Sequence, residues 1–236
     1  MTTTLYALHG FLGTPADWDA LLKKNELKYA LKAPNLFEKS PSSTLLSWAK
    51  DFNQEAANFK GKRYLMGYSL GGRLALHALL QNPSLWNAAI IISANPGLTS
   101  QEEKLKKSQE NERWAHRFEN EAWEQLMKEW NEQGVFKESF TFERREKDYS
   151  RSALAAALRN WSLDSQENLT SKIATLSQPI LWIVGDKDPK LSYLNQLTLK
   201  NPLSKICRIP DAGHRAPWQQ PAYFLDLVDS FLLPIL

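Results

Sequence analysis

Six short apolar runs alternate with longer stretches of helical periodicity, and this alternation constrains the fold more than any other feature of the chain. The runs are LYAL, YALKAP, KRYLMGY, AAIIIS, PILWIVG and SKICRIP. Helical patterns such as STLLSWAKDFNQEAANF and QQPAYFLDLVDSFL separate most of them. Strands that alternate with helices in this way are typical of a parallel sheet covered on both faces. We therefore predict an α/β fold with a mostly parallel sheet.

The alternation stops in one long segment, which begins near Thr99 and ends near Leu169. This segment is highly charged and rich in tryptophan, and it contains no β-like run. We predict that it forms an inserted helical cap over residues 99–169, lying above the strand ends. Residues 1–98 and 170–236 would then form the α/β core, in two pieces of the chain.

Composition excludes several classes of protein. A chain of 236 residues with 43% hydrophobic residues can bury one sizeable core. The net charge of +3 is spread among acidic residues, which argues against nucleic acid as a partner. No apolar run approaches the roughly 20 residues that a membrane span requires. The lone Cys207 excludes an intramolecular disulfide framework, and the first residues do not resemble an export signal, so we expect a cytoplasmic protein.

The segment GYSLGG places Ser69 between two glycines, where a β-like run ends and a helical pattern begins. In a G-x-S-x-G turn of this kind, the serine hydroxyl is held out at the carboxyl edge of the sheet. The backbone N–H of Leu70 would point toward a ligand there and could donate to a developing oxyanion. A second donor is expected from the turn LHGF after the first run, in the form of the Phe11 N–H.

A serine needs a histidine base, and four histidines are present. His77 lies inside the helix after Ser69 and His116 lies in the insertion, so we expect structural or solvated roles for both. His214 follows the last β-like run, at the expected edge of the sheet. The orienting acid should come from the preceding run, where we favour Asp188; the alternatives are Asp186 and Asp211.

In this pattern the chain resembles the α/β-hydrolase fold, and more narrowly the menaquinone-pathway lyases called 2-succinyl-6-hydroxy-2,4-cyclohexadiene-1-carboxylate synthases (MenH). The resemblance covers nearly the whole chain. It rests on LHGFLGTPADW, MGYSLGGRLALH, NPGL followed by EEKLKK, the segment Trp130 to Phe136, and IPDAGH.

The resemblance implies a reaction that removes pyruvate from a cyclohexene carrying succinyl, enolpyruvyl and carboxylate groups. Ser69, His214 and Asp188 would abstract a ring proton, without a cofactor or metal; the sequence has no motif for a metal, nucleotide or flavin. The rival interpretation is a carboxylesterase or thioesterase that uses Ser69 as a nucleophile. A non-catalytic relative is disfavoured, because all three triad residues are retained.

A polycarboxylate substrate requires cations, and Arg73 lies one helical turn after Ser69, so it should project toward the same side of that helix. Relatives carry arginines on the first cap helix, where this chain has Lys104 and Lys107, with Arg113 as another source of a guanidinium. The resemblance also implies substrate contacts by Tyr68, Trp130 and one of two adjacent arginines, Arg144 or Arg145. We name Arg145 of this pair.

Two features depart from the family. The chain begins almost directly with the LYALHG run, so one or two strands that usually precede it should be missing or reduced. The loop from Asn35 to Ser43 lacks the glycines common in relatives, which should change the shape of the pocket. The oligomeric state does not follow from the sequence.

Overall fold

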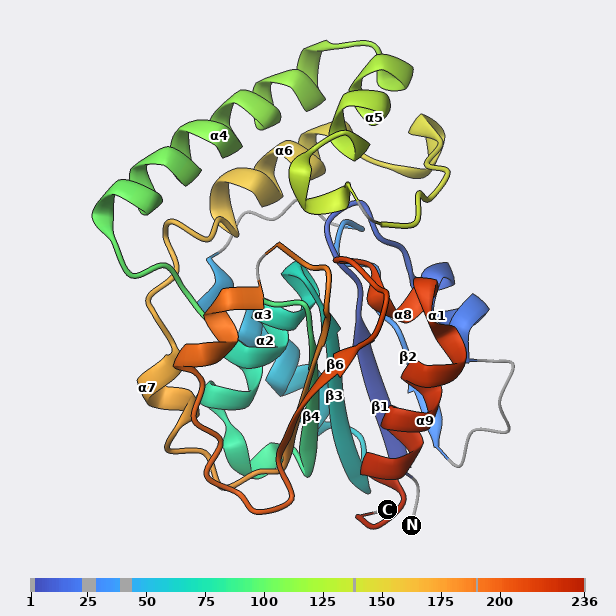
Figure 1. Cartoon of the computed structure of the whole chain (residues 1–236), viewed down its shortest axis with the longest axis vertical. Coiled ribbons are helices and arrows are strands. Elements are labelled where there is room, and N and C mark those ends of the chain that lie inside the picture. Colours follow the sequence, from blue (N-terminus) through green and yellow to red (C-terminus); the bar gives the residue numbers. More distant parts are fainter. Residues whose placement is uncertain (1–2, 23–28, 39–43, 138, 190, 236) are drawn as a thin grey trace.

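The computed structural model describes residues 3–22, 29–38, 44–137, 139–189 and 191–235. Its centre is a sheet of six strands in the order β2-β1-β3-β4-β5-β6, and every neighbouring pair is parallel (Figure 1). The strands are β1 (Thr3–Leu8), β2 (Ala30–Lys32), β3 (Lys62–Tyr68), β4 (Ala88–Ile92), β5 (Ile180–Gly185) and β6 (Lys205–Ile209). Each of the six predicted runs overlaps one of these strands, so the predicted fold class is confirmed.

Helices cover both faces of the sheet, as the apolar strands require. Alternate strand residues point into two separate cores: Leu65 and Ile91 pack in one, while Met66 and Ile90 pack in the other. The first core includes residues of α2 (Leu45–Ala57) and α3 (Leu70–Gln81). The second includes residues of α1 (Pro15–Leu22), α8 (Ala216–Gln219) and α9 (Pro221–Leu232). The short elements η1 (Pro83–Leu85), α7 (Thr170–Ile173) and η4 (Leu191–Gln196) complete the core connections.

The segment between β4 and β5 is helical, as its charged, tryptophan-rich sequence predicted. It contains α4 (Gln101–Asn120), α5 (Trp123–Asn131), η2 (Gly134–Phe136), η3 (Glu146–Asp148) and α6 (Arg151–Asn160). In Figure 1 these helices form a separate layer at the carboxyl ends of the strands. The buried amide of Asn111 on α4 donates to the carbonyl of Leu158 and to the hydroxyl of Ser162, which ties α4 to α6. The boundaries 99 and 169 stay a prediction.

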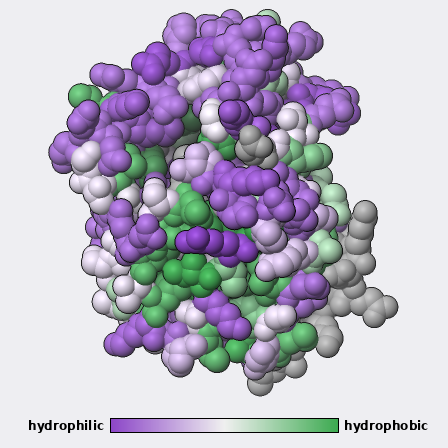
Figure 2. All heavy atoms as spheres, viewed as in Figure 1, coloured by the Kyte–Doolittle hydropathy of each residue, from purple (hydrophilic) through white to green (hydrophobic). Residues whose placement is uncertain are grey.

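Helix α4 has one face exposed to solvent and one face buried against the rest of the protein. Ser100 caps its amino end in a capping box with Glu103, which fixes where the helix begins. Figure 2 shows hydrophilic side chains over the outer face of this layer, whereas Ala115 and Phe118 are buried beneath it. Among the described residues, no helix is long and apolar enough to cross a membrane.

The sheet edge near the start of the chain is short. The edge strand beside β1 is the three-residue β2. That strands usually found before β1 are missing or reduced stays a prediction. In the altered loop, Leu36 and Phe37 are buried, and the Leu36 N–H donates to His9 Nε2. Residues 39–43 of that loop lie outside the described residues.

The first turn of α3 lies directly against the end of β1, and two glycines make this approach possible. A Cβ atom on Gly71 would collide with the carbonyl oxygens of Leu8 and His9, and one on Gly67 would collide with the Gly71 carbonyl. The glycines of the G-x-S-x-G turn are therefore required by contact between backbones.

Replacing Gly71 by Ala should lower the free energy of unfolding by about 3 kcal/mol, because strand and helix must separate to admit the methyl group. Gly134→Ala is a matched control, since a Cβ atom there meets nothing within 4 Å. Urea denaturation of both variants measures the difference. Equal stability of the two would contradict the role given to the approach of α3 to β1.

Candidate active site

Ser69 occupies a strained turn between β3 and α3. Its backbone has φ 53° and ψ −111°, a conformation that residues other than glycine rarely adopt. The turn is held by its neighbours: the Ser69 N–H donates to the Ile92 carbonyl at 2.8 Å, and the Ser69 carbonyl accepts from the Arg73 N–H. The hydroxyl is thereby presented at the carboxyl edge of the sheet.

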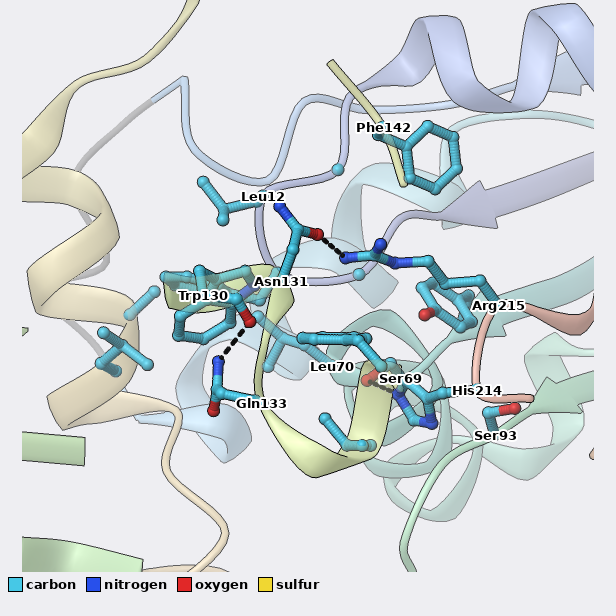
Figure 3. A pocket seen from close by; sticks show the side chains of 18 of the residues that line it. Leu12, Ser69, Leu70, Ser93, Trp130, Asn131, Gln133, Phe142, His214 and Arg215 are labelled. Atoms are coloured by element: carbon cyan, nitrogen blue, oxygen red, sulfur yellow. Dashed lines mark hydrogen bonds between the residues drawn. The ribbon is translucent and has the colours of Figure 1, made fainter. Parts of the chain in front are cut away.

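The structure brings Ser69, His214 and Asp188 together from three strand ends. His214 Nε2 lies 3.0 Å from Ser69 Oγ, and His214 Nδ1 lies 2.8 Å from Asp188 Oδ2 (Figure 3 shows the serine and histidine). Asp188 and His214 are only 2% and 3% exposed, so water does not compete for the contact between them. The alternative acids lie elsewhere: Asp186 accepts from the Ala212 N–H, and Asp211 pairs with Lys187.

Phe11 and Leu70 line the same pocket as Ser69. Their backbone N–H groups have no hydrogen-bond acceptor within the part of the chain that the structure describes. Leu70 is the first residue of α3, where an N–H has no partner inside the helix. Phe11 lies in a tight turn closed by the Gly13 N–H, which donates to the Gly10 carbonyl at 2.9 Å. Both donors are thus available to a ligand oxygen.

His9 supports the Phe11 turn from below. It is 1% exposed; its Nδ1 lies 2.8 Å from the Gly10 carbonyl, and its Nε2 accepts from the Leu36 N–H at 3.0 Å. This pair of contacts requires the neutral imidazole with its proton on Nδ1. Burial lowers the pKa of His9 to about 4, so the ring stays neutral.

The pocket above Ser69 is strongly cationic. Among the described residues that line it are one carboxylate, that of Asp17, and four cationic side chains, those of Arg73, Lys107, Arg144 and Arg215. Aromatic side chains supply much of the remaining wall, including Trp114, Trp130, Phe136, Phe142 and Trp161. A pocket of this composition suits an anionic ligand with an apolar ring.

Arg73 reaches the pocket as its spacing from Ser69 predicted. Its guanidinium donates to the Trp161 carbonyl at 2.7 Å and to Gln166 Oε1 at 3.4 Å, both neutral acceptors. Burial lowers the pKa of Arg73 to about 10, and the group therefore keeps its charge at neutral pH.

The two lysines predicted on the cap, Lys104 and Lys107, differ in whether they line the pocket. Lys107 lines the pocket and pairs with Glu110 at 2.9 Å. Lys104 is not among the pocket residues, and Arg113 is exposed on α4. Contact of Lys104 with the substrate stays a prediction, whereas Lys107 lies where a ligand in the pocket would meet it.

Of the two adjacent arginines, Arg144 lines the pocket, and contact of Arg145 with the substrate stays a prediction. The Arg145 side chain is 62% exposed and pairs with Asp148. Arg144 donates through both terminal nitrogens to Asp17, at 2.8 and 2.7 Å. Burial lowers the pKa of Arg144, but the hydrogen bonds and charge of Asp17 outweigh it and raise the pKa overall.

Tyr68 and Trp130 line the pocket as expected. The Tyr68 ring lies 5.4 Å from the His214 ring, and burial raises the pKa of its hydroxyl, which stays protonated. Trp130 packs on Phe11 with ring centroids 4.9 Å apart, which places a cap side chain directly over the proposed donor turn.

Sequence reasoning missed Arg215, Asn131 and Asp17. Arg215 follows His214 directly, and that adjacency was the signal available for it. The two remaining histidines are where they were expected: His77 is buried on α3 away from Ser69, and His116 is exposed. Within the described ranges, no cluster of three or more His, Cys, Asp or Glu side chains could hold a metal ion.

Comparison with known proteins shows the family of the chain. The model of the Alpha/beta hydrolase family matches residues 5–227. The chain belongs to the alpha/beta hydrolase family. Among solved alpha/beta hydrolase structures, MenH from S. aureus superposes with a TM-score of 0.89 at 19% identity, covering 99% of this chain and 95% of that one. A thermophilic esterase from Thermogutta terrifontis gives 0.78 at 20% identity, covering 100% and 91%.

The names of similar curated proteins point to one activity within the alpha/beta hydrolase family. A protein of Haemophilus influenzae named putative 2-succinyl-6-hydroxy-2,4-cyclohexadiene-1-carboxylate synthase is 29% identical, covering 97% of this chain and 96% of its own. A Salmonella newport protein named 2-succinyl-6-hydroxy-2,4-cyclohexadiene-1-carboxylate synthase is 30% identical, covering 72% and 68%.

The neutral state of His9 predicts a dependence of stability on pH. The imidazole titrates near 6.5 in the unfolded chain and near 4 in the folded one, so the unfolded state binds the proton first as the pH falls. The stabilisation is complete above about pH 7, declines between about 6.5 and 4, and amounts to about 3 kcal/mol. Urea denaturation across this range should show a shallower decline for His9→Gln. The exposed His116→Gln should retain the full decline, and an unchanged slope in His9→Gln would refute the assignment.

Proposed function

We propose that this protein is a carbon–oxygen lyase that forms 2-succinyl-6-hydroxy-2,4-cyclohexadiene-1-carboxylate and pyruvate from 2-succinyl-5-enolpyruvyl-6-hydroxy-3-cyclohexene-1-carboxylate. The observation that carries the proposal is the Ser69–His214–Asp188 chain of contacts beneath a pocket whose described residues include four cations and one carboxylate. A substrate with three carboxylates matches such a pocket. The relatives named for this product support the same conclusion.

The reaction begins with removal of the ring proton next to the succinyl ketone. His214 Nε2 accepts the Ser69 hydroxyl proton, and the serine oxygen takes the proton from carbon. Asp188 holds the imidazole in the required tautomer and stabilises its positive charge. The electron pair released from the C–H bond moves onto the ketone oxygen and gives an extended enolate.

The enolate oxygen is the charge that the site must stabilise. The N–H groups of Phe11 and Leu70 donate to it, as they would to the oxyanion of an ester hydrolase. The enolate then collapses: the ketone re-forms, the enolate electrons form a new ring double bond, the existing ring double bond moves one position toward the leaving group, and the C–O bond to the enolpyruvyl group breaks. The proton held at the base returns to the departing enolate, which becomes pyruvate, so no water is consumed.

The cations hold the substrate around this centre. Arg73, one turn beyond Ser69, binds a carboxylate, and Lys107 and Trp130 close the pocket from the cap. An ester hydrolase with an apolar acyl group would gain nothing from the buried charge of Arg73. The cytoplasmic location expected from the sequence remains part of this proposal.

An ultraviolet assay with the cyclohexene substrate tests the function, because the diene product absorbs where the substrate does not. Wild-type protein should release diene and pyruvate in equal amounts. Ser69→Ala and Arg73→Ala should each lower kcat/KM about a hundredfold, the first through loss of the base relay and the second through loss of substrate binding.

Arg208→Gln serves as the control for this assay, since Arg208 is exposed on β6 outside the pocket and should leave kcat/KM unchanged. If no diene forms and p-nitrophenyl esters are cleaved in a Ser69-dependent way, the proposed lyase function is wrong and the protein is a carboxylesterase or thioesterase.

A further inference from the structure

Arg215 lies between the proposed base and the cap. It follows His214 in the chain, and its side chain lines the pocket with Ser69 while being only 7% exposed. Figure 3 shows its side chain extending away from Ser69 and His214 toward Asn131, where the guanidinium donates a hydrogen bond to Asn131 Oδ1 at 2.9 Å. The Phe136 ring lies 4.1 Å from the guanidinium carbon.

The contacts of Arg215 position its charge without neutralising it. Within the described residues, the guanidinium donates to the Phe140 carbonyl and to Asn131, and it interacts with the Tyr68 hydroxyl. None of these hydrogen-bond partners is an acid. The charge of Asp17 also acts on Arg215, but both Asp17 carboxylate oxygens accept hydrogen bonds from Arg144. A buried cation that shares its countercharge with a second cation is costly, and in an open pocket a bound anion can supply the missing charge.

The other pocket cations differ in this respect. Arg144 is matched by both carboxylate oxygens of Asp17, and Lys107 is matched by Glu110. Arg73 resembles Arg215, because its hydrogen-bond acceptors are a carbonyl and an amide. Two guanidiniums therefore lack an acidic hydrogen-bond partner, and they reach the pocket from different places, α3 and the loop after β6.

We propose that Arg215 binds a carboxylate of the substrate and, together with Arg73, makes the enzyme selective for substrates that carry two or more carboxylates. The inference rests on the proposed function in assuming an acidic substrate, but it concerns a residue that neither the triad nor the family motifs supply. The neighbouring His214 accepts the proton from Ser69, whereas Arg215 contributes to substrate binding.

The test compares cis-cyclohexane-1,2-dicarboxylate with cyclohexanecarboxylate as inhibitors of diene formation, and measures their binding directly by calorimetry. Wild-type protein should bind the dicarboxylate at least about tenfold more tightly. Arg215→Gln should abolish this preference and raise KM about tenfold, with kcat changed less than about twofold. Arg215→Lys, which keeps the charge and loses the fork, should retain part of the preference.

Arg208→Gln is again the matched control and should bind both compounds as wild type does. If Arg215 only anchors the cap, both Arg215 variants should have a lower Tm and a lower kcat but keep the dicarboxylate preference. That outcome would overturn the proposal. Absence of a preference in the wild-type protein would overturn it equally. If the lyase assay is silent but calorimetry shows a preference that depends on Arg215, the proposed reaction fails and the carboxylate site stands.

Discussion

The site depends on the close contact between the first turn of α3 and the end of β1. Because Gly71 has no side chain, the helix can begin against the Leu8 and His9 carbonyls, and Ser69 is forced into its strained turn. The same contact brings the Leu70 N–H and the Phe11 turn to one pocket. One backbone approach thus sets the positions of the proposed base relay and of both oxyanion donors.

The groups that hold the pocket arginines determine how much of their charge is available to a ligand. Asp17 neutralises Arg144, whereas Arg73 and Arg215 are held by carbonyl and amide oxygens. Neutral acceptors fix a guanidinium in place and leave its field available to a ligand. The ketone oxygen gains negative charge as the ring proton leaves, so fixed cations and N–H dipoles favour that state without reorganising. This is how parts that serve ester hydrolysis in some relatives can serve an elimination.

The sequence was informative where local rules apply. The six strands follow from apolar runs, and Ser69 and His214 follow from turns at strand ends. Asp188 could be preferred but not separated from Asp186 and Asp211, because three nearby loops meet only in the folded sheet. The sequence could not decide which of Arg144 and Arg145 lines the pocket, since loop register determines which neighbour faces inward. The pairing of Asp17 with Arg144 spans 127 residues, and no local pattern encodes it.

That pair also bears on how the cap can move. The inserted segment leaves the sheet after β4 and returns before β5, and Asp17 on α1 fastens its far side through Arg144. Tyr149 adds a hydrogen bond to the Leu12 carbonyl beside it. The loop after β6 adds another attachment, because Arg215 donates to Asn131 and to the Phe140 carbonyl of the inserted segment. A segment that is joined to the core at two chain crossings and at these buried contacts cannot swing away as a hinged flap without breaking them, so opening of the pocket by such a motion carries the cost of separating a buried ion pair.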